Sequence, residues 1–149
     1  MFQKAIYLDM DGTIANLYAV PNWLLKLRAF DPTPYREASP LVRMSRLARL
    51  LNHLKNEHGY VIGIVSWLSK EPDAYYDKAV SNAKREWLAE HLPSVQFDEI
   101  HIIAYGTPKS SVVDCPFGIL FDDEEKNREE WKGMACDPFD ILNILKALD

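Results

Sequence analysis

The stretch Ile6-Tyr7-Leu8-Asp9-Met10-Asp11-Gly12-Thr13 decides the fold of this chain. Its apolar first part is too short for a helix and is rich in strand-forming residues, which predicts a buried strand over residues 5–8. Asp9 and Asp11 follow at the carboxyl end of that strand, where an open α/β sheet binds its ligands. Two carboxylates so close together repel each other unless a cation or a proton separates them. The motif therefore indicates an Mg²⁺ site, although an ordinary acidic turn closed by glycine would carry the same residues.

The composition narrows the class of protein. The 149 residues are enough for one domain with a full core, and 48% hydrophobic and 26% charged residues are usual for a soluble protein. A net charge of -5 makes long nucleic acid a poor partner, because its binding depends on phosphate neutralisation by Lys and Arg. The net charge does not exclude a small anionic substrate held by a metal and one or two cationic side chains.

The sequence carries no sign of export or of membrane insertion. Residues 2–8 lead directly into the first predicted strand, without the apolar core of a signal peptide, and no stretch approaches the roughly 20 apolar residues of a membrane span. Cys115 and Cys136 lack C-x-x-C spacing, which favours two buried reduced thiols over a disulfide. We therefore expect a cytoplasmic protein without a membrane partner.

Apolar runs alternate with helical patterns along the rest of the chain. Strands are predicted at 60–65, 99–104, 117–121 and 134–136, and helices at 40–57, 74–90, 127–131 and 139–148. Ser39 is expected to cap the first of these helices, with Pro40 at its first position. The alternation predicts an α/β fold with a parallel sheet and right-handed crossovers, built as one domain over residues 1–149.

Residues 14–39 interrupt this alternation. Prolines at 21, 32 and 34 prevent a continuous helix, and a short helix over 22–28 with Asn22 as its N-cap is expected. We interpret the segment as a small cap insertion after the first strand, lying over the strand ends. An irregular loop whose aromatic residues pack on the body of the domain is the alternative.

Polar residues follow the other predicted strands as well. Ser66 follows the second strand, Lys109 the turn after the third, and Asp122 and Asp123 the fourth. The carboxyl ends of parallel strands share one edge, so these side chains are expected near Asp9. The Ser66 hydroxyl could donate to a phosphoryl oxygen, and Lys109 could supply a fixed cation. The alternative is that these are ordinary solvated side chains, which are common at strand ends.

The four histidines receive no role. His53, His58 and His91 fall on helix surfaces or ends without a partner at metal-binding spacing. His101 falls within a predicted strand, where a packed side chain is the usual outcome.

These features together resemble the haloacid dehalogenase superfamily, whose members are mostly phosphatases, over nearly the whole chain. Asp9 to Thr13 resembles its first motif, Ser66 its second, Lys109 its third, and Ile119 to Asp123 its fourth. The resemblance implies a three-layer α/β/α Rossmann-like fold. It also implies an Mg²⁺-dependent phosphomonoester hydrolase that acts through an aspartyl-phosphate intermediate.

The same resemblance implies a role for each residue. Asp9 is the nucleophile, and Asp11 is the general acid and then the general base. Mg²⁺ is held by the Asp9 carboxylate, the Asp11 backbone carbonyl and the fourth motif, with Asp123 favoured as the direct ligand and Asp122 as its supporting neighbour. The implied substrate- and phosphate-binding residues are Thr13, Ser66, Trp67 and Lys109.

Within the superfamily, the chain most resembles the small 5'(3')-deoxyribonucleotidases, through residues 82–93 and 121–133. A nucleotide is therefore the predicted substrate, with Trp23, Tyr35 or Trp67 available to stack on its base. The insertion is shorter than the usual cap of that family, which leaves a polynucleotide 3'-phosphatase-like enzyme as an alternative. A phosphotransferase, and a non-catalytic phosphate-binding or scaffold domain of the same fold, also stay open.

Overall fold

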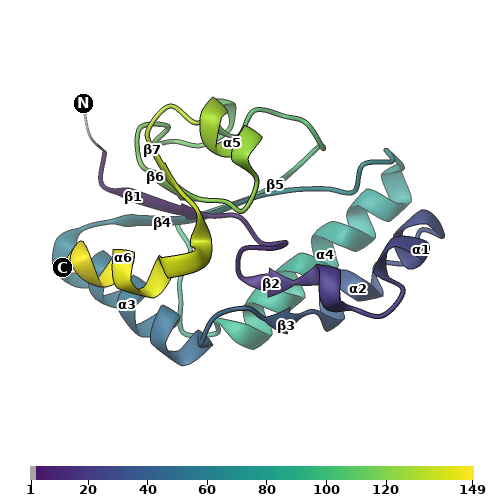
Figure 1. Cartoon of the computed structure of the whole chain (residues 1–149), viewed down its shortest axis with the longest axis horizontal. Helices are drawn as coiled ribbons and strands as arrows, with labels where there is room; N and C mark the ends of the chain where they lie inside the picture. The colour runs from purple at the N-terminus through teal and green to yellow at the C-terminus, as the bar shows by residue number, and fades with distance from the viewer. Residues whose placement is uncertain (1–2) are drawn as a thin grey trace.

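The computed structural model describes residues 3–149 as a parallel β-sheet with helices packed on it (Figure 1). The five strands lie in the order β5-β4-β1-β6-β7, and all neighbouring pairs are parallel. Their bounds are Ala5–Leu8 for β1, Val61–Trp67 for β4, Glu99–Ile103 for β5, Ile119–Phe121 for β6 and Met134–Cys136 for β7. The predicted α/β fold class with a central parallel sheet is confirmed.

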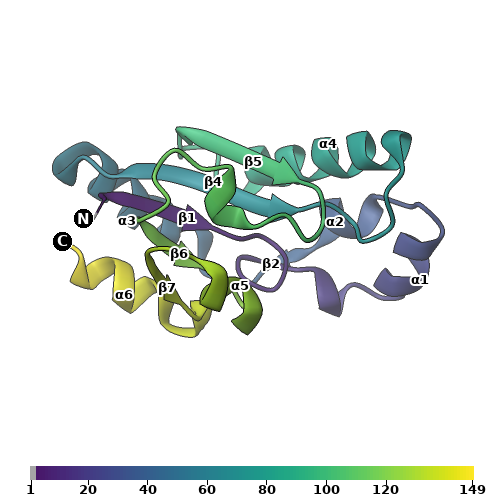
Figure 2. The ribbon, with the colours of Figure 1, turned by 90° about the horizontal axis from the view of Figure 1, so that it is seen from above.

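The later strands lie on both sides of the central strand β1. It passes through β4 to β5 on one side of β1 and later returns to form β6 and β7 on the other side. Such a reversal of strand order opens a crevice at the carboxyl end of the central strand. Figure 2 shows the carboxyl ends of β1 and β4 directed towards a group of small helices.

The two faces of the sheet are covered unequally. Ile6 and Leu8 of β1 face the main core, which includes side chains of α3 (Met44–His58), α4 (Ala74–His91) and α6 (Ile141–Ala147). The alternate residues, Ala5 and Tyr7, face a smaller core formed with the segments around η2 (Lys109–Ser111) and α5 (Glu125–Glu130). This division follows from the alternation of side chains along a strand.

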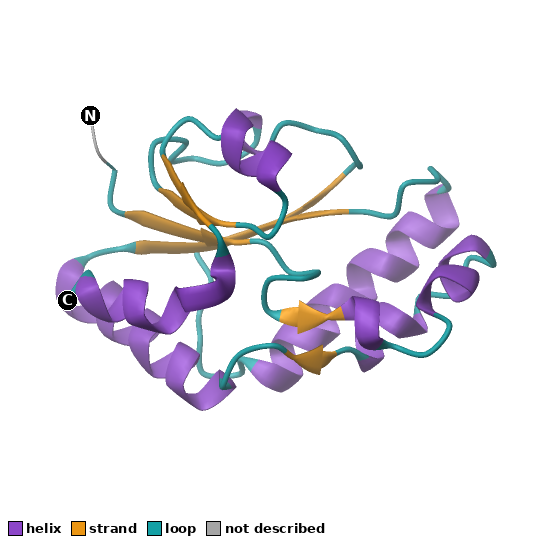
Figure 3. Ribbon diagram, in the orientation of Figure 1, coloured by secondary structure: helices purple, strands orange, loops and turns teal. Residues whose placement is uncertain are grey.

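Residues 14–40 form a substructure of their own beside the carboxyl ends of the strands (Figure 3). β2 (Ala15–Asn16) and β3 (Ser39–Pro40) pair in antiparallel fashion and close its base. Between them lie η1 (Leu17–Ala19), α1 (Trp23–Arg28) and α2 (Thr33–Glu37). Leu17 and Tyr35 pack against the α4 side chains Tyr76 and Val80, so this substructure is attached to the domain mainly through α4.

Of the two helix caps predicted in this region, the one at Ser39 is wrong, whereas Asn22 occupies the N-cap position of α1. Ser39 and Pro40 belong to β3, and α3 begins only at Met44, because pairing with β2 and a bond from the Leu41 N–H to the Ile14 carbonyl (2.8 Å) keep the chain extended. Asn22 precedes α1 as predicted, but its backbone is left-handed (φ 59°) and its side chain makes no capping bond.

The structure also bears on membrane insertion and on the two cysteines. Across residues 3–149, no helix is both long enough and apolar enough to cross a membrane. Cys115 and Cys136 are free thiols and only partly buried. Cys115 packs against the smaller core and Cys136 against the main core.

The approach of β7 to β6 gives the first testable prediction. A Cβ on Gly133 would overlap the backbone of Phe117 and Gly118, and backbone atoms cannot move aside as a flexible side chain can. We expect Gly133→Ala to lower the free energy of unfolding in urea by about 2–3 kcal/mol.

Gly106→Ala is the matched control. Gly106 has φ 87° and nothing near its Cβ position, so its substitution should cost only about 1 kcal/mol of backbone strain. Equal losses for the two variants would show that the close approach of the backbones is not the constraint.

Candidate active site

A tight turn follows β1 and fixes the direction of Asp9. The Asp9 N–H donates to the Phe121 carbonyl at 3.0 Å, so sheet pairing extends one residue beyond β1. The Met10 carbonyl then accepts bonds from the N–H groups of Thr13, Ile14 and Ala15 at 3.1, 3.0 and 2.9 Å. Gly12 is required here on two grounds, because its φ is 79° and a Cβ would overlap the Asp123 carboxylate.

Lys109 joins the carboxylates at the ends of two neighbouring strands. Its Nζ lies 3.0 Å from Asp9 Oδ1 and 2.6 Å from Asp122 Oδ2. All three residues are buried, with exposed fractions of 5% for Lys109, 6% for Asp9 and 0% for Asp122. Burial lowers the pKa of Lys109, but the charges of Asp9 and Asp122 outweigh it and raise that pKa overall. Lys109 is therefore a fixed cation at the carboxyl end of β1.

The two aspartates after β6 have different surroundings. Asp122 accepts bonds from Lys109, from Asn127 Nδ2 at 3.2 Å and from the Glu124 N–H at 3.0 Å, so both of its oxygens are engaged. Asp123 has its N–H bonded to Thr13 Oγ1 at 3.2 Å, and the same hydroxyl donates to Asp9 Oδ2 at 3.0 Å. Thr13 thus holds Asp9 and Asp123 beside each other.

This carboxylate group fits a hard divalent cation. Asp9, Asp122 and Asp123 each offer one carboxylate oxygen, and the three atoms lie within 4.8 Å of one another. Burial, followed by the charge of Asp9, raises the pKa of Asp123 to about 8 and that of Asp122 to about 6. Lys109 balances only part of the negative charge, and oxygen donors are the ligands that Mg²⁺ prefers. Of the two aspartates after β6, Asp123 is better placed to ligate a metal ion, because both oxygens of Asp122 already accept bonds from protein donors.

Lys84 is a second buried lysine, which the motifs in the sequence did not single out. It is fully buried, and its Nζ donates to Asp11 Oδ2 at 2.8 Å, Ser66 Oγ at 2.7 Å and the Trp67 carbonyl at 2.8 Å. Burial raises the pKa of Asp11, while the charge of Lys84 acts in the opposite direction. The sequence pattern could have indicated this role, because Lys84 lies on the same face of α4 as the apolar residues Val80 and Trp87. A lysine buried on such a face needs hydrogen-bond or ion-pair partners.

The predicted site residues come together at one end of the sheet, but they do not share one cavity. Asp9, Asp11, Trp67, Lys109 and Asp122 line a cavity of about 380 Å³. Thr13 and Asp123 line a neighbouring cavity on the far side of the turn. Ser66 is fully buried within β4, and its hydroxyl is held by Lys84.

The walls of the 380 Å³ cavity are aromatic. Tyr18, Trp23 and Tyr35 reach it from the 14–40 substructure, and Trp67 and Tyr105 reach it from the ends of β4 and β5. The ring centroids of Trp67 and Tyr105 are 4.8 Å apart, and the Trp67 indole donates to the Thr107 carbonyl at 2.8 Å. Arg28 and Lys70 also line the cavity. It can therefore receive a molecule with one anionic end and one flat apolar end.

Comparison with known proteins gives little further information. No protein-family model matches the chain, and no curated protein matches it. Among solved structures, it is similar to the D,D-heptose 1,7-bisphosphate phosphatase from Burkholderia thailandensis, with 16% identity and a TM-score of 0.49 over 85% of this chain and 70% of that chain. A likeness this distant does not bear on the chemistry of the site.

The crowding at Asp123 leads to a prediction about stability and metal. Its pKa is raised in the folded state, so its protonated form contributes stability that is present below about pH 4 and lost as the pH approaches 8. At pH 8 in EDTA, we expect Asp123→Asn to be more stable than wild type in thermal unfolding, by roughly 1 kcal/mol after allowance for solvent screening.

Mg²⁺ should reverse this order. It should raise the melting temperature of wild type by mass action and should raise that of Asp123→Asn much less. Two outcomes would contradict the assignment of Asp123 to a cation site: an Asp123→Asn protein less stable than wild type in EDTA, or equal Mg²⁺-induced shifts in the melting temperatures of the two proteins.

Lys84 gives a prediction with a control on the same helix. Lys84→Met leaves the buried Ser66 and the partly buried Asp11 without their donor, so we expect the free energy of unfolding to fall by about 3–5 kcal/mol. Lys78→Met, on the exposed side of α4, should change it by less than about 0.5 kcal/mol. Chemical denaturation measures both, and a mild effect at Lys84 would show that these contacts add little to stability.

Proposed function

We propose that this protein is an Mg²⁺-dependent phosphomonoester hydrolase of the haloacid dehalogenase type, which works through an aspartyl-phosphate. The observation that carries the proposal is the position of Asp9. Its carboxylate lines the cavity at the reversal of strand order, 3.0 Å from the fixed cation Lys109 and 3.0 Å from the Thr13 hydroxyl. These contacts hold one oxygen donor in place and balance charge where a phosphoryl group would bind.

The covalent step assigns separate roles to the two aspartates. An Asp9 carboxylate oxygen attacks phosphorus, the bond from phosphorus to the leaving oxygen breaks, and Asp11 gives that oxygen a proton. Water then attacks the phosphorus of the aspartyl-phosphate while Asp11 takes a proton from it. The bond from phosphorus to the Asp9 oxygen breaks, which releases phosphate and restores the carboxylate. Burial raises the pKa of Asp11, which favours the protonated form that the first step needs.

The residues around Asp9 would bind the phosphoryl group that is transferred. Lys109 would contact the phosphoryl oxygens from the Asp9 side, and Ser66 would need to turn its buried hydroxyl from Lys84 to join it. Asp9, Asp123 and the Asp11 carbonyl would hold Mg²⁺, with Asp122 in support, and the bound ion would supply charge neutralisation and orientation.

A nucleotide is the substrate that the cavity supports best. Base stacking requires exposed ring faces, and four of the five aromatic side chains that line this cavity are at least partly exposed, Tyr35 being the buried one. Three of the five, Tyr18, Trp23 and Tyr35, come from residues 14–39, which we propose act as a small cap over the site. Arg28 and Lys70 at the same cavity would suit a second phosphate, so a 3'-phosphorylated oligonucleotide is the alternative substrate.

Phosphate release tests the proposal. We expect wild type with Mg²⁺ to hydrolyse a nucleoside 5'- or 3'-monophosphate faster than a sugar phosphate, a 3'-phosphorylated oligonucleotide or an aryl phosphate. Asp9→Asn keeps the shape of the side chain but removes the nucleophile, and it should lower the rate by at least roughly 10³-fold.

Each outcome favours a different assignment. Preference for the oligonucleotide would favour the 3'-phosphatase, and preference for the sugar phosphate would overturn the nucleotide assignment. A wild type that is inert on every substrate would point to a phosphotransferase or a non-catalytic domain. Equal rates for wild type and Asp9→Asn would rule out Asp9 as the nucleophile.

A further inference from the structure

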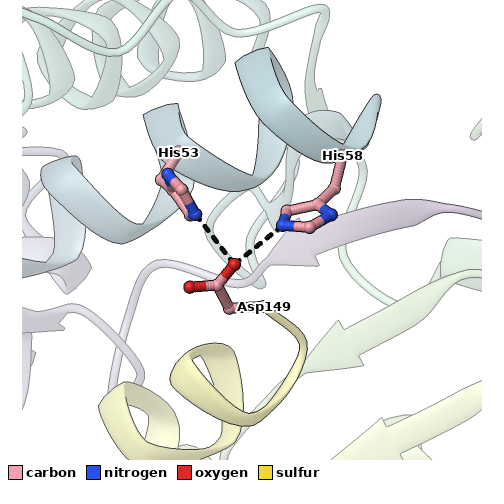
Figure 4. A group of neighbouring side chains, drawn as sticks. All are labelled: His53, His58 and Asp149. Carbon is pink, nitrogen blue, oxygen red and sulfur yellow. Dashed lines mark hydrogen bonds and ion pairs between the residues drawn. The ribbon is translucent and has the colours of Figure 1, made fainter.

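A second cluster of metal-ligating side chains lies away from the candidate active site. His53 and His58 belong to α3, and Asp149 follows α6 (Figure 4). The Nε2 atoms of the two histidines lie 2.8 and 2.7 Å from the same oxygen, Asp149 Oδ1. One atom from each residue lies within 4.8 Å of the other two.

The fold brings these residues together in spite of an unfavourable spacing. Five residues along an α-helix place two side chains about 140° apart, which is why no metal-binding pair was predicted here. His58 is the last residue of α3, and its ring lies 5.5 Å from that of His53 at an angle of 74°. α6 packs against α3, with Leu145 and Leu51 both in the main core, and this packing carries Asp149 to the two rings. The expectation that these histidines have no partner is therefore wrong.

We propose that His53, His58 and Asp149 form a Zn²⁺-binding site. Two imidazole nitrogens and one carboxylate oxygen are a common donor set for zinc, which then takes water at a fourth position. Tetrahedral bonds of about 2.0–2.2 Å set the ligating atoms roughly 3.3 Å apart. The present distances of 2.8 and 2.7 Å are shorter than this, and the Asp149 side chain is 52% exposed, so it can move outward.

The charged side chains around the cluster favour an ion pair without metal, which competes with zinc binding. Arg43, Arg46, Arg49 and Lys146 line a cavity that also includes His53 and Asp149, and Lys4 donates to the His58 carbonyl. These cations oppose the binding of a metal ion. Hydrogen bonds from the two histidines lower the pKa of Asp149, so the carboxylate is charged and can serve either a metal or an ion pair without metal. A metal site would bind zinc and an ion pair without metal would not, so a binding experiment separates the two cases.

Co²⁺ provides a direct test, because a four-coordinate Co²⁺ ion absorbs visible light far more strongly than a six-coordinate one. We expect one equivalent of Co²⁺ to give this absorption in the full chain at neutral pH, and one equivalent of Zn²⁺ to remove it. His53→Gln and His58→Gln should each weaken Zn²⁺ binding by roughly tenfold or more in titration calorimetry, since even residues behind the ligands cost that much.

Two controls separate this site from the rest of the chain. Asp9→Asn alters the candidate active site, and His91→Gln removes a histidine on α4, so both should keep the Co²⁺ absorption and the Zn²⁺ affinity. Circular dichroism in EDTA checks that the His53 and His58 variants fold. Absorption that survives in both of those variants, or a folded wild type that gives neither absorption nor zinc heat, would overturn the proposal.

Discussion

The contact of Lys109 with Asp9 and Asp122 is the constraint on which the site depends. β1 and β6 are adjacent and parallel, so their first residues beyond the sheet bring two carboxylates together inside the protein. Burying unpaired charges costs far more than a folded domain can bear, and one lysine within 3.0 Å of both makes the arrangement possible. Asp123 adds a third carboxylate that Lys109 does not balance, which leaves negative charge that a further cation would neutralise.

The two buried lysines divide the carboxylates into two environments. Lys109 pairs with Asp9 and Asp122, whereas Lys84 pairs with Asp11 and with the Ser66 hydroxyl. Asp9 and Asp11 are separated by one residue, yet each has its own counterion from a different part of the chain. The nucleophile and acid roles that we propose for Asp9 and Asp11 need carboxyl groups whose surroundings differ, and the two separate counterions supply such a difference.

The sequence was sufficient where the pattern was local. Asp9 and Asp122 directly follow β1 and β6 as predicted, because a buried parallel strand has a distinct composition. Ser66 lies one residue before the end of β4, and Lys109 lies in the connection that follows β5. The start of α3 could not be predicted, since Ser39 and Pro40 pair with β2 and the capping pattern does not report that tertiary contact. The partnership of Asp149 with His53 and His58 was hidden for the same reason, because it depends on how α6 packs on α3.

Tyr7 shows how a residue far from the chemistry can position it. Its hydroxyl donates to Glu99 Oε2 at 2.6 Å and accepts from the Cys115 N–H at 3.0 Å, and Glu99 Oε1 accepts from the Asp114 N–H at 3.0 Å. These bonds tie the connection between β5 and β6 to the middle of the sheet, on the face that no long helix covers. Lys109 lies in that connection, so its place beside Asp9 depends on polar bonds rather than on a large apolar core. Polar bonds are directional, and they suit a cation whose nitrogen must meet two carboxylates at once.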